Sequence, residues 1–126
     1  MATGARIFLA TGGVAAILAV ALGAFGAHAL KSRLAPEMLA VWHTGIEYHL
    51  FHSLGLVAAG LVAAQLPESS LIRWAGWAML AGILLFSGSL YALALSGERW
   101  VGAITPIGGL AFLAAWALFV AAVLKG

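Results

Sequence analysis

The sequence predicts an all-α membrane protein in which four transmembrane helices form an antiparallel up-and-down bundle. Of its 126 residues, 64% are hydrophobic and only 8% are charged, whereas about a quarter of an ordinary soluble domain is charged. The apolar residues fall into four long segments, and a helix needs about 20 such residues to cross hydrocarbon about 30 Å thick. Six basic and four acidic side chains are too few to cover a soluble domain. We therefore expect lipid to surround a single domain, residues 1–126.

The four predicted spans are residues 7–30, 38–66, 71–95 and 105–124. The first contains no charged residue, whereas the second is uniformly apolar only from about Leu50 onward. The fourth is expected to begin with Thr105 as N-cap and Pro106 at the first helical position, where proline is tolerated. Residues 97–104 would then form an interfacial or re-entrant stretch.

Short connections join the predicted spans, so consecutive helices should be antiparallel neighbours with both chain termini on one side of the membrane. The basic residues do not decide which side is cytoplasmic. Three of them lie on each side: Arg6, Arg73 and Lys125 on one, and Lys31, Arg33 and Arg99 on the other. The free amino group slightly favours cytoplasmic termini.

Small residues recur at helical spacing on the first two spans, as is typical of faces on which membrane helices pack closely. The first stripe comprises Gly12, Ala16, Ala19, Gly23 and Ala27, and the second comprises Gly45, His52, Gly55, Ala59 and Ala63. The second stripe places His52 against another helix. Because an unpaired imidazole is costly in hydrocarbon, His52 should have a protein, water or ligand partner.

A polar cluster at the start of the second span contains His43, Glu47, His49 and His52. Imidazole and carboxylate groups three or four positions apart can bind a metal, a haem-like cofactor or a proton. However, the sequence has no HExxH motif and no second His-rich helix, so we expect no metal site. We expect the first three side chains to lie near the headgroups, and a buried hydrogen bond is favoured over a ligand role for His52.

The other polar candidates are few. His28 closes the first span and could cap its last carbonyls or meet the second span near His43 and Glu47. Ser87 and Tyr91 are four residues apart and share one face of the third span. The chain has no Asp or Cys and no recognisable set of catalytic residues, so we do not expect an enzyme.

Four ordered motifs resemble the YgdD-like family, which is domain-of-unknown-function family 423 and includes animal relatives called transmembrane protein 256. The motifs are GAFGAH at 23–28, TGIEYHLFH at 44–52, FSGSLY at 86–91 and TPIGG at 105–109. The resemblance implies a small four-span protein of the bacterial inner (plasma) membrane and carries over no reaction or cofactor. The family pattern does not require histidine at 43 and often has glutamine at 49. The resemblance therefore favours, as functional residues, His28, Tyr48, His52, Ser87 and Thr105.

These observations favour a non-enzymatic protein that binds a small ligand, a lipid or a partner through a polar surface shared by spans one to three. The ligand candidates are His28, Tyr48, His52, Ser87, Tyr91 and Thr105. One alternative is an oligomeric small-solute or ion transporter or channel. Another is a quinone- or haem-interacting redox subunit with His28 and His52 as ligands. The expected partners are the lipid bilayer and either a second copy or another membrane protein, with no nucleic acid; the sequence specifies no cofactor.

Overall fold

The computed structural model describes all 126 residues and contains helices but no strands, with four helices long and apolar enough to cross a membrane. The four helical stretches are Thr3–Leu30, Pro36–Gln65, Ser70–Ser96 and Arg99–Lys125. The first consists of α1 (Thr3–Phe25) and the π-helical turn η1 (Gly26–Leu30), and the second is α2 (Pro36–Gln65). The third joins α3 (Ser70–Gly82), a second π-helical turn η2 (Ile83–Ser87) and α4 (Gly88–Ser96). The fourth is a 3₁₀ turn, η3 (Arg99–Ala103), followed by α5 (Thr105–Lys125). This confirms the predicted all-α class with four apolar helices.

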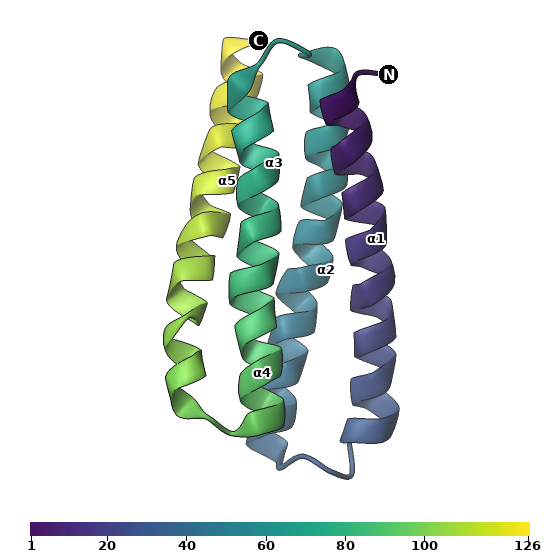
Figure 1. Ribbon diagram of the computed structural model, residues 1–126, viewed down its shortest axis with the longest axis vertical. Coiled ribbons are helices and arrows are strands. Elements are labelled where there is room, and N and C mark those ends of the chain that lie inside the picture. Colours follow the sequence, from purple (N-terminus) through teal and green to yellow (C-terminus); the bar gives the residue numbers. More distant parts are fainter.

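The helices lie side by side, and Figure 1 shows consecutive ones running in opposite directions with both chain termini at the same end. The most extensive packing is between α1 and α2 and between α3 and α5. Contacts of α2 with α3, η2 and α4 join these two pairs. In Figure 1 α1 and α5 lie on opposite sides of the array. The two central helical stretches therefore hold the molecule together.

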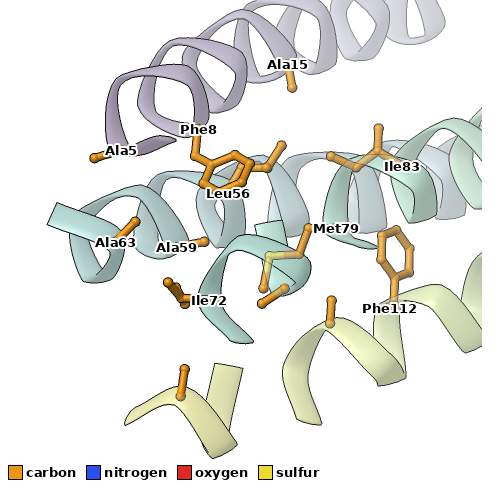
Figure 2. Close-up of a cluster of buried hydrophobic side chains, with 13 residues drawn as sticks. Ala5, Phe8, Ala15, Leu56, Ala59, Ala63, Ile72, Met79, Ile83 and Phe112 are labelled. Atoms are coloured by element: carbon orange, nitrogen blue, oxygen red, sulfur yellow. The ribbon is translucent and has the colours of Figure 1, made fainter. Parts of the chain in front are cut away.

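The main apolar core occupies the half of the molecule nearer the termini and draws side chains from every long helix (Figure 2). Its fully buried large members include Phe8, Leu56, Ile72 and Met79, and small alanines fill the space between them. A smaller cluster of Leu30, Trp42 and Ala94 lies at the other end. Because lipid surrounds the outside, this packing relies on van der Waals fit rather than on removal of apolar surface from water.

The small-residue stripes lie mostly at helix contacts. Gly12 is buried, and a Cβ there would lie 2.9 Å from the carbonyl oxygen of Ser53. Six of the other stripe residues are also buried: Ala19, Gly45, His52, Gly55, Ala59 and Ala63.

The lower end of the first stripe differs from the prediction. Ala16 and Gly23 are half-buried and Ala27 is exposed. Gly26 takes its place and packs against the Trp42 indole. The reason is that the buried face continues at seven-residue spacing from Gly12 through Ala19 to Gly26, so Ala27 is turned away from α2.

The predicted capping role of Thr105 is wrong. α5 begins at this residue, but Thr105 is already helical and its side chain makes no cap. Its hydroxyl instead lies 2.6 Å from that of Ser89 in α4. The preceding segment turns at Gly97, which has a φ of 73°, and then forms η3. Glycine suits that turn because side chains rarely tolerate positive φ.

Candidate functional site

A groove with a volume of about 870 Å³ lies between α2 and α5. About three consecutive turns of α5, from Pro106 to Trp116, form one wall. The opposite wall comes from α2, and Phe86 of η2 lies between them. The groove is larger than a second hollow, of about 600 Å³ beside the connection between α2 and α3, and mostly apolar side chains line it, so it is the main candidate for binding a small molecule.

His52 lies in the floor of the groove with both ring nitrogens hydrogen-bonded. It is 4% exposed, and its Nε2 lies 3.0 Å from the indole Nε1 of Trp116. Because the indole can only donate, Nε2 must accept. Nδ1 therefore carries the proton and donates to the carbonyl oxygen of Tyr48, 2.8 Å away. The ring also stacks on Phe112, with centroids 3.5 Å apart and planes 11° apart.

The two hydrogen bonds of His52 limit what its ring can bind. A neutral imidazole whose two nitrogens are both engaged inside the protein has no free atom to offer a metal or a ligand. His52 therefore acts as a polar tie between α2 and α5 rather than as an open coordinating group.

Aromatic rings line the rest of the groove. The ring of Tyr48 lies 4.5 Å from that of Phe86 and is nearly parallel to that of Phe112 at 6.2 Å. Phe51 and Trp116 meet edge to face at 6.1 Å. Tyr48 is 43% and Phe51 62% exposed, so the groove opens on the outer surface, where lipid is expected.

Glu47 is the only charged residue among those that line the groove, and it is exposed. Tyr48 packs beside Phe112, and His52 bonds to Trp116, four positions further along both helices. Glu47 therefore lies level with the second turn of α5. Because the α5 wall runs from Pro106 to Trp116, Glu47 borders the groove about halfway along that wall, and His52 lies level with its inner end.

The groove exists because α5 follows the third helical stretch rather than α2. Gly108 packs directly against the backbone of Phe86, which leaves no room for a Cβ, and Gly82 accepts the ring of Phe112 in the same way. These glycines draw the start of α5 onto η2. As a result, α2 and α5 are bridged by side chains and stand apart at the backbone.

His49 occupies a different place from the one predicted. We expected it near the headgroups, but it is buried, with its Nδ1 2.8 Å from the Tyr91 hydroxyl. It borders a smaller hollow of about 240 Å³ lined also by Ala15 and Leu84. His49 and His52 both lie on the buried side of α2, but His49 faces α1 and α4, whereas His52 faces α5.

The remaining hydroxyl groups tie helices together. Ser87 donates to the carbonyl oxygen of Gly45 at 2.7 Å. Ser89 donates to that of Phe86 at 2.9 Å, which makes Thr105 the donor in the Ser89–Thr105 hydrogen bond. Each of these bonds joins or stabilises helix turns next to η2.

The polar candidates therefore do not form one surface shared by three spans. His28 and His43 are both exposed. Gly26 packs on Trp42, ten positions before His52, so His28 lies at least about 15 Å from His52 along the helix axis. No group of three or more potential metal-ligating side chains comes together.

Sequence reasoning missed the contribution of the fourth span. Phe112 and Trp116 are four residues apart and lie on one face of α5, and both contact His52. A tryptophan near the middle of a span was the available signal, because its N–H needs an acceptor that lipid cannot supply.

Four long apolar helices with a lipid-facing aromatic groove define a small integral membrane protein. The chain belongs to the family described as Protein of unknown function (DUF423), which matches residues 22–109. This confirms the resemblance seen in the motifs. The UPF0382 membrane protein YwdK of Bacillus subtilis is 47% identical over 120 residues, covering 95% of this chain and 98% of its own. UPF0382 membrane proteins of Staphylococcus epidermidis and Staphylococcus haemolyticus are 43% and 40% identical, each covering 95% of this chain and 97% of their own. No solved structure matches the chain.

Proposed function

We propose that this protein is a non-enzymatic membrane protein that binds an amphiphilic molecule from the surrounding bilayer in the groove between α2 and α5. The observation that carries the proposal is the groove itself, an aromatic recess of about 870 Å³ that is open toward lipid. Sites for small molecules commonly have volumes of about 300–1,000 Å³ and apolar walls with a few polar groups.

The proposed setting is the bacterial plasma membrane, with both termini on the same side. The even number of candidate spans supports this arrangement. We propose that the protein acts as a single subunit in binding, since both walls of the groove come from one chain. A second copy or another membrane protein could cover the open side.

The arrangement of His52 favours binding over catalysis. Both its ring nitrogens are engaged, and Glu47 is the only carboxylate along the groove. A general acid and base pair or an activated nucleophile needs at least two groups within hydrogen-bond reach of each other. The same engagement, with His28 far along the axis, argues against a cofactor held by His28 and His52.

The test is saturable quenching of Trp116 by a brominated fatty alcohol added to purified protein in dodecyl maltoside. The exposed Trp74, Trp77 and Trp100 are replaced by Phe. Trp116 then reports from the groove, while Trp42 is only 1% exposed and stays unquenched.

A matched pair of variants decides whether quenching comes from the groove. A Cβ at Gly109 would meet only the Phe86 ring, at 3.8 Å, so Gly109→Leu should fold and fill the groove. A Cβ at Gly13 would meet nothing within 4 Å, so Gly13→Leu adds the same side chain elsewhere. We expect Gly109→Leu to abolish saturable quenching and Gly13→Leu to retain it. Equal quenching in both variants would disprove the proposed function.

A further inference from the structure

We propose that the occupant of the groove is a lipophilic organic cation, an apolar or aromatic body that carries a single positive charge held by Glu47. This inference rests on the proposed function and specifies the class of its ligand. It follows from which side chains along the groove still have a charge or a free hydrogen-bonding atom to offer a ligand.

Charge complementarity points to a cation. Glu47 borders the groove, and no Lys or Arg lines it. An ionisable residue within a membrane-crossing helix is costly unless a partner meets it, and it therefore marks a candidate binding site. A positive charge on the ligand would be that partner.

The aromatic rings next to Glu47 fit the same ligand. Tyr48 follows Glu47 directly, and its ring lies 4.5 Å from that of Phe86. The faces of aromatic rings attract cations, and the attraction strengthens where water is excluded. The ring of Tyr48 is still 43% exposed, so it remains accessible to a molecule in the groove.

The inner end of the groove offers no hydrogen-bonding atom to a second polar group. The Trp116 N–H is used by His52, and the remaining His52 nitrogen is used by the backbone. A polar headgroup can therefore be met only at Glu47 and at the hydroxyl of the neighbouring Tyr48, and the part of the ligand beside Trp116 must be apolar. A phospholipid fits poorly, because its phosphate would lie near the carboxylate without a basic residue to balance it.

The experiment compares two rigid ions of similar size and opposite charge, tetraphenylphosphonium and tetraphenylborate. Their binding to the purified protein is measured by equilibrium dialysis in dodecyl maltoside, an uncharged detergent. Glu47→Gln removes the carboxylate. Glu37→Gln is the matched control, since Glu37 is exposed in the first turn of α2, outside the groove, and its replacement changes the net charge equally.

We expect the cation to bind saturably and the anion not to. Glu47→Gln should weaken binding of tetraphenylphosphonium by about tenfold or more, as expected for loss of a contact to a charged group, and Glu37→Gln should leave it unchanged. Equal binding of both ions, or equal effects of both variants, would overturn the inference. Displacement of the cation by phosphatidylethanolamine would also overturn it, since the site would then belong to a phospholipid headgroup.

The two proposals fail in distinguishable ways. If the brominated alcohol reaches Trp116 in a Gly109-dependent manner but tetraphenylphosphonium shows no dependence on Glu47, the groove binds amphiphiles and the cation assignment is wrong. If Gly109→Leu affects neither ligand, the groove is not the binding site and the proposed function is wrong as well.

Discussion

The indole N–H of Trp116 in α5 donates to Nε2 of His52 in α2 over 3.0 Å. This bond crosses the floor of the groove, where the two helix backbones stand apart, and it joins the two helix pairs. It also determines which nitrogen of His52 carries the proton. This one contact therefore stabilises the packing of α2 on α5, fixes the protonated nitrogen of His52 and shapes the floor of the groove.

A double-mutant cycle should show that this contact is energetically coupled. His52→Leu leaves the Trp116 N–H without its acceptor, and Trp116→Phe removes the donor, so the double variant should lose less stability than the sum of the single variants. Hydrogen bonds between membrane helices contribute about 0.6 kcal/mol on average and up to about 1.7 kcal/mol, and we expect a coupling in this range. Unfolding in mixed detergent and SDS micelles measures it. Strictly additive losses would show that the bond contributes nothing.

The tautomer of His52 is directly observable. Since Nε2 accepts from Trp116 and Nδ1 lies 2.8 Å from the Tyr48 carbonyl oxygen, the neutral ring should be protonated at Nδ1. In ¹⁵N spectra of histidine-labelled protein at neutral pH, one ring should show a protonated Nδ1 and an unprotonated Nε2. The assignment is made with His52→Leu, which should remove that signal. A His52 signal with a protonated Nε2 would contradict the described geometry.

Close approach of α1 and α2 should make Gly12 intolerant of even one methyl group. A Cβ at Gly12 would lie 2.9 Å from the Ser53 carbonyl oxygen and 3.0 Å from the Val57 nitrogen, so the backbones would have to separate. We expect Gly12→Ala to lower the free energy of unfolding by about 1–3 kcal/mol, the usual cost of overpacking. Gly13→Ala, whose Cβ meets nothing within 4 Å, is the control and should not destabilise. Similar stability of the two variants would refute the close approach.

The hydroxyl of Thr105 should stabilise the start of α5 through Ser89, 2.6 Å away. Thr105→Val keeps the shape and removes the hydrogen bond, so it should cost about 0.5–1.5 kcal/mol. Thr105→Ser keeps the hydroxyl and should retain most of the stability. Unfolding in detergent measures the loss, and amide exchange in Arg99–Ala103 should quicken in the valine variant alone. If both variants behave alike, the hydrogen bond is not the source of the stability.

Much of the fold could be predicted from the sequence because hydropathy and length are local properties. A chain with so few charges must place its apolar segments in lipid, and each segment must be helical to satisfy its own backbone there. The face of α2 that carries His52 could also be predicted, since small residues at helical spacing mark a contact. The partner of that face could not be identified in the same way.

The sequence by itself determined the four helices, their apolar character and the need for a partner at His52. Only the tertiary structure decided that this partner is Trp116, that His49 turns inward to Tyr91, and that Glu47 borders a groove rather than only a headgroup layer. The physical reason is that hydropathy and periodicity describe each helix alone. The separation and rotation of α2 and α5 depend on glycines such as Gly108, which meets Phe86 only after the chain has folded.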